Sequence, residues 1–360
     1  MPLVASTERS QVGHVKLDGP NDWQIGYVLQ APTEPTQDDD PLLIFAHPFT
    51  NNSEYWQPQL QSDLIGGRYW CLAFDAAGHG TSPTYGRQWD IQDTARAIVK
   101  IASTVLGESG DTLDRPQSDG FPSRAVCIGC SMGGFGSLRG ALLDAQRVRS
   151  QHKRPLIAGV LSFGSSAEPE HKDFVEEYYK TANAAADRAR SGNPLEAIKM
   201  IADGIASDQY GKEAGLRNAQ KSYDWGRAVI ERSLSYSFAA NSLGKPIDAS
   251  MSFDKVQASL EPQSTADQIM INFNALLKRD GIEASISSKD STVLCPVLIV
   301  HGTEDVAYPI DRKFPETKLK HLQSAGVKAE IKMIEGAPHF GTVSFADEFN
   351  RILADWLKTI

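Results

Sequence analysis

Two glycines flank a serine in the segment Gly129-Cys130-Ser131-Met132-Gly133, where an apolar strand pattern gives way to a helical one. A serine in this context adopts a strained backbone conformation, and the positions two residues before and after it must lack side chains because the turn is tight. The turn raises the hydroxyl above the sheet beside the N-terminus of the next helix, which stabilises negative charge. The pattern therefore predicts Ser131 as a nucleophile.

A serine hydroxyl needs a base to become a good nucleophile, and the base needs an acid to orient it. Asp305 comes just after the strand pattern VLIVHG (297–302), and His339 lies in the loop after the last strand pattern. Both side chains then lie at the carboxyl edge of a parallel sheet, where open α/β sheets form their sites. We expect a triad of Ser131, His339 and Asp305, with Glu168 as the alternative acid.

The negative charge that develops on an attacked carbonyl oxygen needs two hydrogen-bond donors. One expected donor is the backbone N–H of Met132, the residue directly after the serine. The loop after the strand pattern at 42–47 supplies the other, and because Pro48 has no N–H, the expected donor is Phe49. The alternative is that this loop has no catalytic role.

The turn FDAAGHGTS (74–82) contains a second Asp and a second His, Asp75 and His79. Its glycines permit a sharp change of direction after a strand. We expect both polar residues to shape the floor of the pocket and to take no part in the reaction.

Short apolar runs alternate with helical patterns along the chain, which predicts an α/β protein with a mostly parallel, eight-stranded sheet flanked by helices. The first two strands alternate with polar residues and precede any helix, so we expect an antiparallel edge hairpin. Polar segments at 33–41 and 107–123 are expected to be surface loops. The expected strands are 14–18, 24–30, 42–47, 69–75, 124–129, 157–163, 297–302 and 328–336. The expected helices of the sheet domain are 91–107, 131–147, 310–325 and 344–358.

The interval 165–290 has amphipathic helical segments and no apolar strand pattern. We therefore expect a helical cap at 165–290, inserted into a core of 1–164 and 291–360. Aromatic side chains of the cap line a substrate pocket or form the core of the cap itself. The residues expected to contact substrate are Pro48, Tyr178, Trp225 and Phe340.

Charge and hydropathy exclude several classes of partner. The 360 residues include 45 acidic and 36 basic ones, and no basic stretch is present, which argues against nucleic acid or an anionic membrane surface as a partner. The sequence contains no run of 18 apolar residues, so we expect no transmembrane helix. The N-terminus lacks the pattern of a secretory signal, so we expect no such signal. The four cysteines follow or lie within apolar runs, so we expect reduced core thiols and a cytoplasmic protein.

Together these residues resemble the α/β-hydrolase superfamily over about 1–164 and 291–360. The resemblance rests on HPF at 47–49, D-x-x-G-H-G-x-S at 75–82, G-C-S-M-G-G at 129–134, G-x-x-D-x-x-x-P at 302–309 and G-x-x-H at 336–339. The chain looks most like the serine esterase and lactonase branch, including relatives of 3-oxoadipate enol-lactonase. It departs from the common pattern at Pro48, where glycine is frequent, and at Ala77, where arginine is common. Ser131 in place of Asp argues against the epoxide-hydrolase and haloalkane-dehalogenase branches.

The resemblance implies hydrolysis of a small ester or lactone through an acyl-enzyme on Ser131, with no metal or cofactor. Three alternatives stay open: an acyltransferase similar to homoserine acetyltransferases, a carbon–carbon bond hydrolase on the same triad, and a small-molecule receptor. No motif indicates the substrate or the oligomeric state.

Overall fold

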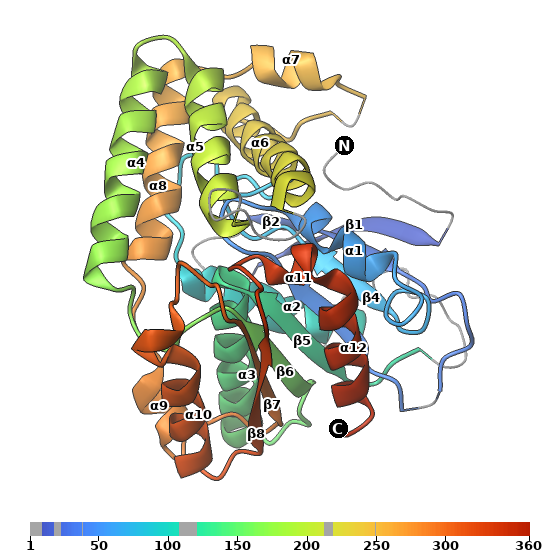
Figure 1. The fold of residues 1–360 in the computed structure, drawn as a ribbon. Coiled ribbons are helices and arrows are strands. Elements are labelled where there is room, and N and C mark those ends of the chain that lie inside the picture. The colour runs from blue at the N-terminus through green and yellow to red at the C-terminus, as the bar shows by residue number, and fades with distance from the viewer. Residues whose placement is uncertain (1–8, 18–22, 38, 108–120, 212–218, 249) are drawn as a thin grey trace.

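One eight-stranded sheet forms the centre of the protein (Figure 1). The computed structural model describes residues 9–17, 23–37, 39–107, 121–211, 219–248 and 250–360. The strand order is β1-β2-β4-β3-β5-β6-β7-β8, with antiparallel pairing at β1–β2 and β2–β4 and parallel pairing from β4 onward. The strands are β1 Ser10–Lys16, β2 Gln24–Gln30, β3 Leu42–Ala46, β4 Cys71–Phe74, β5 Ala125–Cys130, β6 Ile157–Phe163, β7 Val297–Gly302 and β8 Ala329–Ile334. The predicted sheet and its antiparallel edge hairpin are confirmed.

Helices cover the sheet, so strands β3, β4, β5 and β7 are buried along their whole length, as their unbroken apolar runs predict. Helices α2 and α3 pack together, and α1 packs on α12. These core helices are α1 Gln57–Leu60, α2 Ile91–Val105, α3 Met132–Gln151, α9 Glu283–Ser287, α10 Phe314–Ser324, α11 Gly341–Ser344 and α12 Ala346–Leu357, with short 3-10 turns η1 Ser53–Trp56 and η2 Ile310–Arg312. The third expected helix begins later than predicted, because Pro315 lies in the first turn of α10 and η2 precedes it.

Most of the predicted loop at 107–123 lies outside the described residues, since the structure describes the chain up to 107 and again from 121. Among the described residues, no helix is long and apolar enough to cross a membrane. All four cysteines are buried and unpaired, as the sequence predicts.

A bundle of helices is inserted between β6 and β7 and stands over the sheet (Figure 1). Within it α4 packs on α8 and α5 packs on α6. Its helices are α4 Lys172–Arg190, α5 Pro194–Gln209, α6 Ala219–Leu243, α7 Phe253–Ala258 and α8 Pro262–Leu277. We call this bundle the helical insertion.

Buried hydrogen bonds join the helical insertion to loops that follow the parallel strands. The amide of Asn272 on α8 donates to the carbonyl of Gly78 at 2.9 Å, and its oxygen accepts from the indole of Trp89 at 2.9 Å and from Gln268 at 2.8 Å. On α6, the hydroxyl of Ser233 donates to the carbonyl of Asn51 at 2.6 Å. The insertion is thereby held against the carboxyl edge of the sheet.

Replacing Asn272 with alanine should lower the free energy of unfolding by about 3 kcal/mol, because three buried partners would lose their hydrogen bond. Denaturant unfolding measures this loss. Asn274→Ala on the same helix is the matched control, since Asn274 accepts one part-buried bond from Tyr179, and it should cost less than about 1 kcal/mol. Equal losses in both variants would contradict the assigned network.

Candidate functional site

The turn from β5 into α3 holds Ser131 in a conformation that few residues other than glycine adopt, with φ 53° and ψ −118°. A Cβ at Gly129 would lie 2.1 Å from the carbonyl oxygen of Gly133, and one at Gly133 would lie 2.0 Å from the carbonyl oxygen of Ala46. Neither position tolerates a side chain, as the sequence pattern predicts. The turn thus packs backbone against backbone on the end of β3.

The chain beyond β7 and the chain beyond β8 bring Asp305 and His339 together. The imidazole Nδ1 of His339 lies 2.9 Å and 3.0 Å from the two carboxylate oxygens of Asp305. The oxygen Oδ1 of Asp305 also accepts the backbone N–H groups of Ala307 and Tyr308, at 2.9 Å and 2.8 Å. Because Nδ1–H donates to the carboxylate, Nε2 is the nitrogen that can accept a proton.

Burial raises the pKa of Asp305, but the charge and hydrogen bond of His339, together with His301 and the amide of Tyr308, outweigh this effect. The pKa of the carboxyl group therefore lies below its ordinary value, and the group is an anion at neutral pH. Glu168, the alternative acid, contributes its backbone carbonyl to the hydroxyl of Ser166 and to Arg279.

The elbow and the histidine loop are neighbours. The thiol of Cys130, directly before the serine, lies 3.8 Å from the carbonyl oxygen of His339. Ser131 is 8% exposed, and His339 and Asp305 are each 3% exposed. Among the described residues, the hydroxyl of Ser131 and the imidazole of His339 form no hydrogen bond with each other. The bond between nucleophile and base is commonly long in structures without substrate.

The loop after β3 is stabilised by two buried imidazoles. Nε2 of His47 accepts the N–H of Ala76 at 2.9 Å, and Nε2 of His79 accepts the N–H of Thr50 at 3.1 Å. Burial lowers the pKa of His47 to about 3 and that of His79 to about 4, so both rings stay neutral near pH 7. Thr50 has a positive φ of 65°, which this bond helps to hold.

The two predicted oxyanion donors lie on the segments that meet at this point. Phe49 follows the strand against which Gly133 packs, and Met132 is the first residue of α3. Both residues are buried, and within the described parts of the chain neither backbone N–H has a protein acceptor. Amides without a protein acceptor are what a developing oxyanion requires, and the pairing of these two donors at Ser131 stays a prediction.

Asp75 supports the same loop from the turn after β4. Its carboxylate accepts the N–H of Ser53 at 2.7 Å and the N–H and hydroxyl of Thr81 at 2.8 Å and 2.9 Å. Burial raises the pKa of Asp75, and these hydrogen bonds oppose the rise. Asp75 and His79 thus form bonds that hold backbone, in line with the structural role expected for them.

The residues predicted to contact substrate lie in different surroundings. Phe340 is buried, and its ring centroid lies 5.2 Å from that of His339 and 5.1 Å from that of Tyr210 in the helical insertion. The carbonyl of Pro48 accepts Nδ1–H of His47 at 2.8 Å. Trp225 is half-buried on α6. The substrate contacts of these residues stay predictions.

A cavity of about 410 Å³ lies between the helical insertion and the loop that carries Asp305. Tyr178 and Gln209 line it from α4 and α5, and Glu304 and Val306, the two neighbours of Asp305, line it from the core. Tyr178, predicted to bind substrate, therefore borders a cavity close to the acid.

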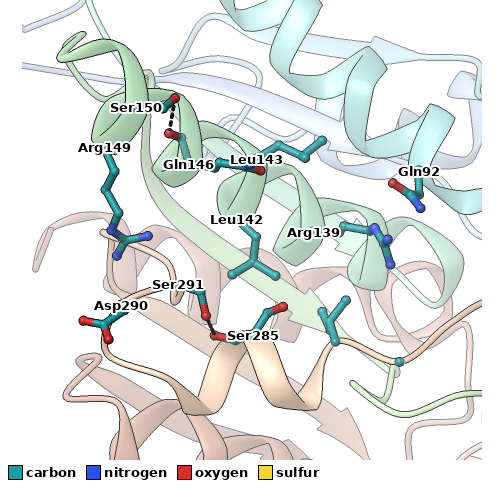
Figure 2. Close-up of a pocket in the computed structure, with 12 residues that line it drawn as sticks. Gln92, Arg139, Leu142, Leu143, Gln146, Arg149, Ser150, Ser285, Asp290 and Ser291 are labelled. Atoms are coloured by element: carbon teal, nitrogen blue, oxygen red, sulfur yellow. Dashed lines mark hydrogen bonds between the residues drawn. The ribbon is translucent and has the colours of Figure 1, made fainter.

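A larger groove of about 630 Å³ lies elsewhere, between α3 and the segment around α9. Figure 2 shows Arg139, Leu142 and Arg149 of α3 on one side and Ser285 of α9 on the other. None of the predicted triad residues lines this groove. Within the described ranges, no three His, Cys, Asp or Glu side chains gather as ligands for a metal ion.

Comparisons with known proteins bear on the family and the fold. The family model described as "Alpha/beta hydrolase family" matches residues 43–352. No curated protein matches the sequence significantly.

Solved structures resemble the chain over nearly its whole length. A thermophilic esterase from Thermogutta terrifontis has a TM-score of 0.61 at 15% identity, covering 97% of this chain and 98% of its own. The enol-lactonase from Burkholderia xenovorans has a TM-score of 0.59 at 16% identity, covering 96% and 100%. A bromoperoxidase from Bacillus anthracis has a TM-score of 0.58 at 15% identity, covering 97% and 100%. At such identities the likeness concerns the fold.

Acid should weaken the folded state through the buried imidazoles. Their pKa values lie below the ordinary 6.5 in the folded protein, so between pH 6.5 and about 4 the unfolded chain binds more protons and stability rises with pH. Each imidazole should cost about 2 kcal/mol of unfolding free energy at pH 5 relative to pH 8.

Denaturant unfolding at the two pH values tests this for the wild type, His79→Gln and His152→Gln. His79→Gln should narrow the difference between the two pH values, whereas the exposed control His152→Gln should leave it unchanged. The same difference in all three proteins would show that His79 does not titrate as its burial requires.

Proposed function

Because this chain belongs to the alpha/beta hydrolase family, we propose that it hydrolyses a small carboxylic ester or lactone through an acyl-enzyme on Ser131. One observation carries the proposal most directly: the carboxylate of Asp305 holds Nδ1 of His339 at 2.9 Å, in a loop that contacts the residue before a strained serine. Strain at a buried polar residue is a sign of function.

In the first half of the proposed reaction, Oγ of Ser131 attacks the carbonyl carbon while Nε2 of His339 takes the hydroxyl proton. The oxyanion accepts hydrogen bonds from the N–H groups of Phe49 and Met132, each worth about 3 kcal/mol in the transition state. The ester C–O bond then breaks, His339 gives its proton to the leaving oxygen, and the acyl group stays on Ser131. In a lactone the leaving alcohol remains tethered to the acyl group.

In the second half, His339 takes a proton from water, and the hydroxide attacks the acyl carbon. Collapse of this intermediate releases the carboxylic acid and returns the proton to Ser131. Asp305 stays ionised throughout and stabilises the imidazolium. The mechanism needs no metal or cofactor.

We assign the helical insertion, α4 to α8, the role of a cap over the site, within the predicted cap interval 165–290 and between core segments 1–164 and 291–360. The short helix α9, also in that interval, packs on α10 of the core. The low exposure of Ser131 supports this role, as does the edge-to-face contact at 5.0 Å between Phe273 of α8 and Phe49 of the oxyanion loop. The 410 Å³ cavity between α4 and the Asp305 loop is bordered by the two neighbours of Asp305, but none of the three triad residues lines it.

Ser131→Ala should abolish labelling by a fluorophosphonate and lower kcat for p-nitrophenyl esters at least about a thousandfold, because the nucleophile is gone. Ser137→Ala is the matched control, since it removes a buried hydroxyl from the same helix. Gel-based labelling and initial rates measure both effects. Labelling that persists in Ser131→Ala, in a protein with unchanged circular dichroism, would refute the assignment.

The rate should fall at acid pH because His339 accepts a proton only when neutral. His47 and His79, with pKa values of about 3 and 4, stay neutral above pH 5. A plot of log kcat/KM against pH should therefore rise with a slope of one on the acidic side. A slope of two would mean that a second group must lose its proton as well.

A further inference from the structure

A buried ion pair joins the two points where the chain crosses between the core and the helical insertion. Nη1 of Arg279, just beyond α8, lies 2.8 Å from Oε1 of Glu170, just before α4. The two side chains are 0% and 1% exposed. Separating such a pair leaves an uncompensated charge away from water, which is strongly unfavourable. The pair therefore resists any separation of the start of α4 from the end of α8.

Tyr308 connects this pair to the proposed acid. Its hydroxyl donates to the carboxylate of Glu170, at 2.9 Å and 3.0 Å from the two oxygens, and its backbone N–H donates to Oδ1 of Asp305 at 2.8 Å. Its carbonyl accepts Nε2–H of His301 at 2.8 Å, and its ring centroid lies 5.5 Å from that of His339. Tyr308 thus contacts Glu170 at the start of the insertion, the proposed acid Asp305 and the proposed base His339.

Arg279 supports the acid–base pair from a second direction. Its Nη2 donates to the hydroxyl of Ser166 at 2.9 Å and to the carbonyl of Glu168 at 3.1 Å, in the turn after β6. In that turn, a Cβ at Gly164 would lie 3.1 Å from Oδ2 of Asp305 and 3.2 Å from Nδ1 of His339. The turn that Arg279 holds is therefore packed directly against the acid–base pair. Its guanidinium also stacks over Phe135 of α3, the helix that follows Ser131, at 4.3 Å.

We propose that Tyr308, Glu170 and Arg279 form a latch that couples the position of the helical insertion to the orientation of Asp305 and His339. The inference rests on the proposed function. In the closed arrangement Glu170 orders Tyr308, which in turn holds the carboxylate of Asp305 by its N–H. When α4 and α8 shift to admit substrate, the latch loosens and the acid loses this support. Tyr308 is a positioning residue, and the triad reaches full competence only with the insertion in place.

Three variants test the latch. Tyr308→Phe removes the hydroxyl and keeps the N–H to Asp305, and Glu170→Gln removes the charge and keeps the shape. Glu54→Gln is the matched control, because Glu54 in η1 forms a part-buried ion pair between the core and the insertion, with Arg232 on α6 at 2.5 Å. Tyr308→Phe and Glu170→Gln should lower kcat about tenfold or more, with a smaller change in KM, since the loss is one of alignment. Glu54→Gln should change kcat less than about twofold.

The pH profile separates positioning from mere structural support. In the described parts of the chain, the charged groups near His339 are Asp305, Glu170 with its partner Arg279, and His301 backed by the buried Lys318. The titratable side chains of Cys130 and Tyr308 also lie against the His339 loop. Loss of the negative charge of Glu170 destabilises the imidazolium, so Glu170→Gln should move the acidic limb of kcat/KM to lower pH. Tyr308→Phe keeps that charge and should leave the limb in place while lowering kcat.

Hydrogen exchange gives a readout that does not depend on activity. Tyr308→Phe should speed hydrogen exchange at the backbone N–H groups of positions 307 and 308, which donate to Asp305. It should also speed exchange in α4 and α8. Glu54→Gln should change exchange at none of these sites. If Glu170→Gln fails to fold, Tyr308→Phe decides alone. If Tyr308→Phe has the same hydrogen exchange and the same kcat as the wild type, the latch is overturned. The wild type could show no Ser131-dependent hydrolysis while Tyr308→Phe still speeds exchange as described. That result would overturn the proposed function and leave the latch standing.

Discussion

The close approach of the turn at Ser131 to the end of β3 is the constraint on which the site depends. Gly133 packs on the carbonyl of Ala46 with no room for a side chain, and Ser131, two residues earlier in the same turn, adopts a positive φ. Such a conformation costs on the order of 1–3 kcal/mol and persists only when the surrounding structure enforces it. In return, the first amide of α3 and the loop after β3 meet at the serine. The strain and the proposed oxyanion site have the same origin.

Buried polar groups help to hold the loops around this turn. The loop after β3 depends on Asp75 and His79, and the Asp305 loop on Tyr308 and its bonds to Glu170. Removing each such group from water costs free energy, which only complete hydrogen bonding offsets. This explains why two imidazoles with depressed pKa values lie beside the site without taking part in the proposed reaction.

Patterns local in the sequence predicted the features that depend on local geometry. The strand-to-helix glycines around Ser131 and the apolar runs of β3 to β7 identified the turn and the sheet, and chain order placed Asp305 and His339 at one edge. The contact between Glu170 and Arg279 could not be predicted, because two charges far apart in the sequence resemble ordinary solvated residues until the fold buries them. The low solvent exposure of Ser131 could not be predicted from the sequence either, since it depends on how the helical insertion packs.

The central claim is that Ser131 carries the acyl group between the two halves of the reaction. Tandem mass spectrometry of protein quenched with acid during turnover of p-nitrophenyl butyrate tests this claim most directly. We predict a butyryl adduct on Ser131 that accumulates during the burst and disappears as substrate is exhausted. Steady turnover with the adduct on another residue, such as Cys130, or with no adduct on any residue at any time, would contradict the account.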